Sequence, residues 1–172
     1  MSYLKSFASY LEVDRDMSEN TVQSYVRDVK NFSKHVGKDL TDVEQSDVRS
    51  FISHLIKLGR KRSSISRITF ALKSFYKYLK DIEQVIDRLP TDNIKIDNRE
   101  KSLPKAINQE DIIKLLNTAS SLGIKQRLLL ELFYGLGGRV SEVVSLKVED
   151  IDFSNNFIRI VGKGNKERHN PI

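Results

Sequence analysis

Apolar side chains recur every three to four residues along most of residues 1–82, and this spacing predicts amphipathic helices. The most regular stripe begins after Ser18, a residue type that caps helices, and ends near Gly37. Comparable stripes predict three more helices, one around residues 4–11, one from about 46 to 58, and one from about 64 to 82. The pattern therefore predicts a compact bundle of four helices.

The helical periodicity lapses between residues 86 and 106, where proline, threonine, aspartate and asparagine are frequent. This composition is typical of a linker. We therefore expect a helical domain over residues 1–85, a linker over 86–106 and a second domain over 107–172.

The second domain is predicted to begin with two helices. Asn108 is placed to cap the first, and the second carries a strongly apolar run over residues 128–133 that we expect to be buried. A glycine-rich turn over residues 135–138 then leads into a short helix from Val140 to about Leu146.

A β-hairpin is predicted to follow. Residues 157–161 have the pattern of a strand, Gly162 and Gly164 suit a hairpin turn, and residues 166–172 form the returning strand. The expected fold class is therefore mainly α, with a small β-hairpin that gives the second domain an α+β character.

The composition limits the class of protein. Apolar residues make up 39% of the 172 residues, which is enough to build hydrophobic cores. No cysteine is present, so disulfide frameworks and thiolate metal sites are excluded, and the cytoplasm is the expected location. The first residues include charged side chains and no long apolar run, so we expect neither a signal peptide nor a membrane span.

The net charge of +6 favours a polyanionic partner without being diagnostic. Residues 1–82 hold 15 basic and 10 acidic residues, and residues 83–172 hold 14 and 13, so most of the excess lies in the first half. Arg60, Lys61 and Arg62 stand near the predicted start of the fourth helix, where the helix dipole repels cations unless an anion is nearby. A phosphate would relieve this repulsion, although a solvated basic turn explains the run about equally well.

Two cations in the second half suit phosphate chemistry. Arg139 follows two glycines, and its planar guanidinium can donate to two oxygens of one phosphodiester. Lys163 stands 24 residues later in the glycine-flanked turn and can give a proton to a leaving oxygen. As an ordinary helix-end residue, Arg139 can instead pair with Glu142 or Glu131, and a Gly-Lys-Gly turn alone is only a hairpin tip. Glu142 is better suited to orient Arg139 or accept from backbone donors than to act as a base.

Longer motifs surround both cations. In the second half they are Tyr134-Gly135-(x3)-Arg139-Val140-Ser141-Glu142, then Leu146, then Asp150-Ile151-Asp152, then Gly162-Lys163-Gly164-Asn165-Lys166-Glu167-Arg168. In the first half they are Ser18-Glu19-Asn20-Thr21-(x3)-Tyr25-(x2)-Asp28 and Ser74-Phe75-Tyr76-(x2)-Leu79. On these motifs the second half resembles the amino-terminal part of the catalytic domain of tyrosine recombinases, most closely the Xer-type enzymes. The first half is similar to the family's core-binding domain, a SAM-like bundle of four helices.

The resemblance implies roles for the two cations. Arg139 would hold the scissile phosphate and balance charge in the pentacoordinate transition state, and Lys163 would protonate the leaving 5′ oxygen as general acid. The family uses no metal and no other cofactor. It forms a covalent 3′-phosphotyrosyl intermediate and then joins a 5′ hydroxyl from another strand, with four protomers acting on two duplexes.

The resemblance also implies a C-shaped clamp on double-stranded DNA, in which the second and fourth helices of the bundle face the major groove. The predicted DNA contacts are polar or basic residues of these helices and of the hairpin: Thr21, Ser24, Arg27, Arg60, Arg62, Ser64, Arg67, Lys73, Lys166 and Arg168. Arg67 and Gln23 are placed to reach base edges, although contact with the DNA backbone or water explains each equally well.

The chain departs from the family pattern in three ways. In the family a His-x-x-Arg motif, a further His or Trp and the nucleophilic Tyr follow the hairpin, and none of these has a counterpart before Ile172. The six tyrosines stand where helix packing explains them. Gly138 replaces a larger apolar residue, and Asn170 replaces an apolar strand residue. We therefore expect the chain to bind DNA without cleaving it.

The sequence is compatible with three functional hypotheses. The leading hypothesis is the amino-terminal portion of a site-specific recombinase that acts in chromosome dimer resolution or in DNA integration and excision. The alternative is a non-enzymatic DNA-binding regulator derived from a recombinase. A helical protein-interaction module with incidental basic turns is the third, and it predicts binding that phosphate competitors do not affect.

Overall fold

The computed structural model describes residues 2–95, 106–162, 164 and 166–171. The chain divides into two compact units, Met1–Ser102 and Leu103–Ile172.

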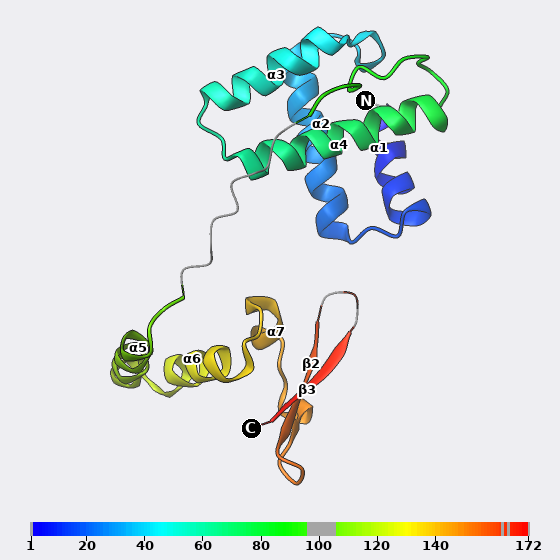
Figure 1. Cartoon of the computed structure of the whole chain (residues 1–172). Helices are drawn as coiled ribbons and strands as arrows, with labels where there is room; N and C mark the ends of the chain where they lie inside the picture. The colour runs from blue at the N-terminus through cyan, green and yellow to red at the C-terminus, as the bar shows by residue number, and fades with distance from the viewer. Residues whose placement is uncertain (1, 96–105, 163, 165, 172) are drawn as a thin grey trace. The chain divides into compact units, whose positions relative to one another are not determined.

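The first unit is a helical bundle (Figure 1). Its elements in chain order are α1 (Ser2–Ser9), the π-helical turn η1 (Tyr10–Asp14), α2 (Glu19–Val36), the 3-10 turn η2 (Leu40–Asp42), α3 (Gln45–Lys57) and α4 (Arg62–Asp81). α4 packs across α2, and both helices contact α1 and α3. The predicted four-helix bundle is confirmed, although α4 begins two residues earlier than predicted.

Local sequence explains the ends of α2. Gly37 takes the left-handed conformation, with φ of 69°, and its N–H donates to the Ser33 carbonyl at 3.0 Å. Ser18 stands at the amino-terminal cap, but its hydroxyl bonds the Thr21 hydroxyl at 2.9 Å instead of a backbone N–H.

The core of the first unit is aromatic. Phe7, Phe32, Phe75 and Tyr76 are fully buried, and the rings of Phe7 and Phe75 meet edge to face with centroids 5.1 Å apart. These rings belong to one hydrophobic cluster, to which α1, α2, α3 and α4 all contribute buried side chains.

The described part of the predicted linker packs on this core. Ile94 is 6% exposed and Thr91 is 3% exposed, and the Gln45 side chain donates to the Asp92 carbonyl. The bundle core therefore receives apolar side chains from beyond the predicted boundary at residue 85, namely Ile86, Leu89 and Ile94.

The second unit combines three helices with a small sheet. Its elements are α5 (Gln109–Leu122), α6 (Ile124–Leu136), α7 (Val140–Val144), the 3-10 turn η3 (Val148–Asp150), β1 (Ile151–Asp152), β2 (Phe157–Val161) and β3 (Glu167–Pro171). The strands form one antiparallel sheet in the order β1-β2-β3. The predicted cap of α5 is confirmed, since the Asn108 side chain accepts from the Asp111 N–H at 2.8 Å. The mainly helical fold class with a small β-hairpin is also confirmed.

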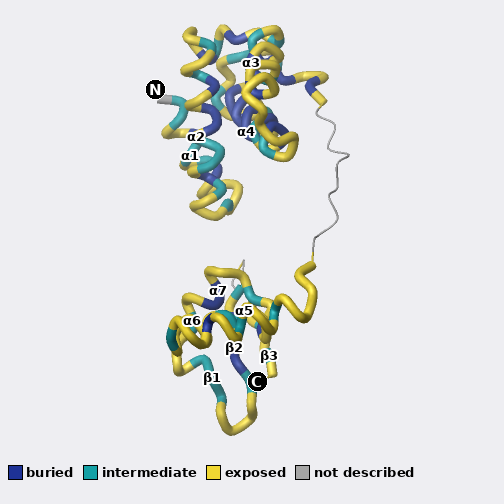
Figure 2. Tube along the Cα trace, turned by 90° about the vertical axis from the view of Figure 1, so that its left-hand side faces the viewer, coloured by how far each residue is buried: buried dark blue, intermediate teal, exposed yellow. Residues whose placement is uncertain are grey.

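Burial in the second unit is more limited than predicted (Figure 2). Its core cluster holds Leu136, Ile158 and Ile160. Leu128 is 54% exposed and Leu129 is 39% exposed, so the prediction that the apolar run of α6 is buried is wrong. Within the described residues, α5, α7 and the sheet cluster each cover part of the α6 surface. The apolar side chains of α6 extend beyond these covered parts, so some of them remain exposed.

The tyrosine prediction is also wrong at one position. Tyr76 and Tyr78 are buried in the bundle core, as helix packing requires. Tyr134 on α6 is 60% exposed, so packing within the described residues does not explain it.

Candidate functional site

The turn between α6 and α7 presents Arg139 at the surface of the second unit. α6 ends at Gly137, which has φ of 54° and whose N–H donates to the Phe133 carbonyl at 3.1 Å. Arg139 follows in extended conformation as the residue before α7, and its side chain is 67% exposed. The glycine turn therefore ends one helix and positions the arginine at the start of the next.

A buried carboxylate holds this arginine. The Glu142 side chain is 4% exposed, and it accepts from the Arg139 backbone N–H at 2.9 Å and from Arg139 Nη1 at 2.6 Å. The pairing with Glu142 that the sequence left open is thus confirmed. Glu131, the other candidate partner, pairs with Arg127 at 2.8 Å.

Arg168 on β3 completes the arrangement. Its Nη2 donates to Glu142 Oε2 at 2.9 Å across a sequence separation of 26 residues. Glu142 therefore lies between two guanidinium groups, and the triad carries a net charge of +1. The sequence predicted Arg168 only as a DNA contact, because nothing in the local pattern shows that β3 reaches α7.

Glu142 is suited to hold its neighbours and not to accept a proton. Hydrogen bonds from Arg168, then from the Arg139 backbone and side chain, lower the pKa of Glu142 to about 2 in spite of its burial. The carboxylate is therefore ionised at neutral pH, and its oxygens are occupied as acceptors. This agrees with the predicted orienting role.

The lowered pKa leads us to expect acid sensitivity in the second unit. A carboxyl whose pKa falls on folding stabilises the folded state above its unfolded value of 4.5, and that contribution disappears as the pH drops toward about 2. The difference in unfolding free energy between the wild type and Glu142→Gln should therefore shrink between pH 5 and pH 2. Urea unfolding, followed by hydrogen exchange of the β2 and β3 amides, measures it. A difference that stays constant with pH would contradict this role for the carboxylate.

Two glycines leave room for the triad. A Cβ at Gly162 would lie 3.1 Å from Glu142 Oε1, and a Cβ at Gly138 would lie 3.0 Å from Val143 Cγ2 and 3.7 Å from Glu142 Oε2. Gly138 therefore fits because Val143 and Glu142 fill the space beside it. The departure at Asn170 also has a local explanation, since its side-chain amide donates to the Leu136 carbonyl at 3.4 Å and ties β3 to α6.

The turn between β2 and β3 begins at Gly162, which lies beside the Glu142 carboxylate. The Gly162 N–H donates to the Lys166 carbonyl at 2.8 Å, and Ile160 pairs with Arg168 in the β2–β3 ladder. Lys166 is exposed beside the turn. Lys163 lies outside the described residues, so its convergence with Arg139 stays a prediction.

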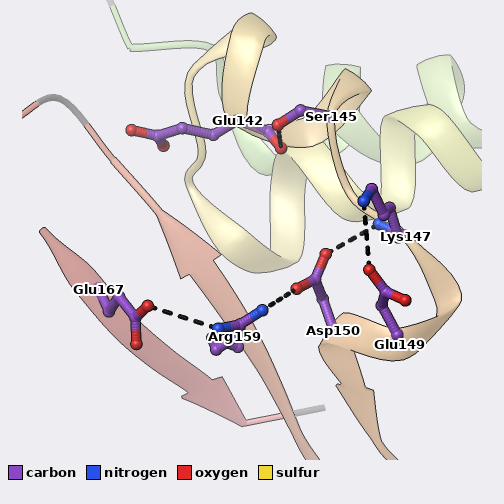
Figure 3. A network of polar contacts seen from close by, with 7 residues as sticks. All are labelled: Glu142, Ser145, Lys147, Glu149, Asp150, Arg159 and Glu167. Carbon is purple, nitrogen blue, oxygen red and sulfur yellow. Dashed lines mark hydrogen bonds and ion pairs between the residues drawn. The ribbon is translucent and has the colours of Figure 1, made fainter. Parts of the chain in front are cut away.

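A second polar network supports the hairpin (Figure 3). Arg159 on β2 contacts Asp150 at 2.9 Å and Glu167 on β3 at 3.4 Å, and Asp150 also accepts from the Lys147 N–H at 3.0 Å. The bonds from Lys147 and Arg159 lower the pKa of Asp150. The sequence analysis missed Arg159, although an arginine in a predicted strand with an acidic residue at a diagonal position of the returning strand was an available signal.

In the first unit, α2, α3 and α4 line a surface groove of about 730 Å³. Four predicted DNA contacts meet there, namely Arg27, Arg60, Ser64 and Arg67. The groove also contains polar residues that the sequence analysis missed: Asn31, Lys34, His35 and His54. The rings of His35 and His54 are 4.7 Å apart, so α2 and α3 bring them together from positions distant in sequence.

The other predicted bundle contacts lie elsewhere on the same helices. Thr21 and Ser24 are half-buried on α2, Arg62 is exposed as the first residue of α4, and Lys73 lines a second groove. The first turn of α4 holds no acidic residue, and no side chain caps its backbone. Within the described residues, the first turn of α4 therefore supplies no carboxylate to the three cations of residues 60–62.

Arg67 is engaged within the bundle. Both of its terminal nitrogens donate to Asp28, the Nη2–Oδ1 distance being 3.1 Å, and the Asp28 side chain is 4% exposed. Gln23 likewise donates to Glu19 at 2.8 Å. A base contact by either residue stays a prediction and has to compete with these bonds.

We expect Arg67→Ala to destabilise the bundle by about 1–3 kcal/mol, because Asp28 would remain buried without its charged partner. The loss should be smaller than for a fully buried pair, since Arg67 is 42% exposed. Urea unfolding of the chain measures it. The double variant Arg67→Ala with Asp28→Asn removes the stranded charge and should be more stable than the single variant. A double variant no more stable than the single would contradict this explanation.

Two other kinds of site are absent from the described residues. Within residues 2–95 and 106–171, gaps excepted, no helix has both the length and the apolar character needed to cross a bilayer. The same part of the chain contains no group of three or more His, Cys, Asp or Glu side chains arranged to hold a metal ion.

Family models match both units. Residues 4–83 match the model "Phage integrase, N-terminal SAM-like domain", and residues 105–172 match the model "Phage integrase family". The two matches fall on the two units that carry the groove and the Arg139 triad.

Individual proteins match along nearly the whole chain. The chain is 36% identical over 177 residues to tyrosine recombinase XerD of Halalkalibacterium halodurans, covering 98% of this chain and 59% of that protein. It is 35% identical over 174 residues to tyrosine recombinase XerC of Staphylococcus aureus, covering 98% of this chain and 58% of that protein. The chain thus spans less than two thirds of the length of these curated relatives.

Solved structures share the fold. A lambda integrase tetramer bound to a Holliday junction aligns with a TM-score of 0.80 at 20% identity, covering 99% of this chain and 49% of that one. The recombinase XerH bound to a palindromic difH substrate aligns with a TM-score of 0.65 at 22% identity, covering 96% and 53%.

Proposed function

Since the chain belongs to the phage integrase family, we propose that it forms the DNA-binding bundle and the first part of the catalytic domain of a site-specific tyrosine recombinase of Xer type. Such an enzyme cuts and rejoins double-stranded DNA through a 3′-phosphotyrosyl intermediate. Its partners are a duplex recombination site and further recombinase protomers, four of them on two duplexes. It acts in the cytoplasm, in chromosome dimer resolution or in DNA integration and excision, and it requires no cofactor.

The Arg139 triad is the observation that carries this proposal. Glu142 fixes the Arg139 guanidinium through Nη1, while 67% of the arginine side chain faces solvent. Arg168 balances the charge of Glu142, so the charge of Arg139 remains available for a phosphodiester. A preorganised cation of this kind stabilises the additional negative charge of a pentacoordinate phosphorus.

Lys163 supplies the second chemical step in this proposal. A lysine protonating the 5′ oxygen removes the need to expel an alkoxide. The turn that carries it begins at Gly162, whose backbone lies against Glu142. The carboxylate that holds Arg139 therefore lies beside the base of the turn.

The bundle supplies most of the affinity for DNA. Cations at Arg27, Arg60 and Arg62 can each neutralise a phosphate, and each such contact contributes about −0.9 to the slope of log K against log salt. The groove between α2, α3 and α4 gathers Arg27 and Arg60 with hydrogen-bonding side chains suited to DNA, and Arg62 lies outside it on the first residue of α4.

A suicide-substrate assay tests the proposal. We expect the 172-residue chain to bind duplex DNA without forming a covalent complex, because none of its tyrosines matches the family nucleophile. A longer polypeptide with the same sequence and the family's nucleophilic tyrosine should become covalently attached to a nicked duplex. Failure to attach despite an intact tyrosine would favour a DNA-binding regulator. Binding by the chain that phosphate competitors leave unchanged would instead favour a protein-interaction module.

A further inference from the structure

Phe70 is an exposed aromatic residue in the middle of α4. It is 60% exposed, whereas Phe7, Phe32 and Phe75 of the same unit are fully buried. Among the Phe and Tyr side chains of residues 2–95, it is the one that is mostly exposed to solvent. Burial of a phenyl ring stabilises a folded protein, and the bundle gains only part of this contribution from Phe70.

The surroundings of Phe70 are aromatic and cationic. It lines a groove of about 300 Å³ together with Tyr10, Tyr25, Arg15, Met17, Lys73, Ser74 and Lys77. This lining includes three cations and, among the described residues, no acidic side chain. α4 itself carries five basic residues and one acidic residue. An apolar ring framed by positive charge fits a ligand that combines phosphates with an apolar group.

Phe70 also lies between two predicted DNA contacts. Arg67 and Lys73 are three residues before and after it on α4, so the three side chains occupy adjoining parts of the helix surface. Arg67 lines the larger groove and Lys73 the smaller one. Arg67 is paired with Asp28, but Arg27, Lys34 and Arg60 also line the larger groove. Cations therefore lie on both sides of Phe70, which suits an extended polyanion better than a compact acidic peptide.

We propose that Phe70 contributes to sequence recognition by packing against the C5 methyl group of a thymine in the major groove. The inference rests on the proposed DNA-binding function and adds a specificity determinant to it. Every base pair offers hydrogen-bonding groups in the major groove, whereas thymine alone offers a methyl group. A phenyl ring can donate no conventional hydrogen bond, so it favours thymine, while the flanking cations fix the helix on the phosphates.

Thymine-to-uracil replacement tests this contact, because it removes only the methyl group. A preferred duplex is first selected from a random library with the 172-residue chain. Each thymine is then replaced by uracil, and Kd is measured by fluorescence anisotropy for the wild type, Phe70→Ala and Phe70→Leu. Ile82→Ala is the matched control, since Ile82 is 56% exposed at the end of α4 and does not line the groove.

We expect uracil at one or two positions to weaken wild-type and Ile82→Ala binding about fourfold, the factor that burial of one methylene-sized group provides. The penalty should vanish in Phe70→Ala and persist in part in Phe70→Leu, with unchanged circular dichroism spectra. Equal uracil penalties in the wild type and Phe70→Ala would overturn the inference and leave the proposed function standing. A wild-type chain with no sequence-selective duplex binding would overturn both.

Discussion

Replacing Arg139 with alanine is expected to abolish strand cleavage by a recombinase that contains this chain and the family's full catalytic domain. The loss should reach at least about 10²–10³-fold, because the guanidinium acts on charge that develops only in the transition state. Duplex affinity should change by no more than about tenfold, or 1.4 kcal/mol, since many other cations bind the phosphates. Covalent trapping on a nicked substrate and fluorescence anisotropy measure the two quantities.

Arg127→Ala is the matched control for this variant. Arg127 is an arginine of the same unit with a 55% exposed side chain, and it pairs with Glu131 on the surface of α6. Its removal takes away the same formal charge and should leave cleavage nearly unchanged. Equal losses of cleavage and affinity in Arg139→Ala would show that Arg139 is an anchor for DNA and not a participant in the reaction.

Replacing Arg60, Lys61 and Arg62 together with alanine should have the largest effect on binding. These cations stand at the amino terminus of α4, where the helix dipole and their mutual repulsion favour a bound anion. Affinity should fall for all duplex sequences alike, and the slope of log K against log salt should become less negative by up to about 2.7 if each cation neutralises one phosphate. Titrations at several salt concentrations, on specific and random duplexes, measure both effects.

A second triple variant separates local contacts from net charge. Lys5, Lys80 and Lys125 are exposed and are not among the predicted contacts, so their joint replacement removes the same charge elsewhere. It should reduce affinity much less and leave the salt slope almost unchanged. Indistinguishable behaviour of the two triple variants would mean that residues 60–62 form an ordinary solvated turn.

The helices of the bundle could be predicted because their signals are local. The stripe of α2, the cap residue at Ser18 and the glycine at position 37 all occur within one helix length and agree with each other. The bounds of β2 were predictable for the same reason, since the glycines at 162 and 164 mark the turn.

The remaining differences arise from contacts between distant segments. Arg168 balances the charge of Glu142 from 26 residues away, and Asp28 binds the Arg67 guanidinium from 39 residues away. No local sequence pattern reveals either contact. The packing of Ile94 on the bundle could not be predicted from a segment whose composition is that of a linker. Hydrophobicity alone also overestimated the burial of Leu128, because it reports the preference of a side chain and not the surface available to cover it.

The most direct test of this account is a crystal structure of the 172-residue chain bound to duplex DNA. It should show Arg139 and Lys163 donating to oxygens of the same phosphodiester, with Glu142 still bonded to Arg139 and Arg168. Side chains 139 and 163 that contact different phosphates, or point to opposite faces of the unit, would contradict it.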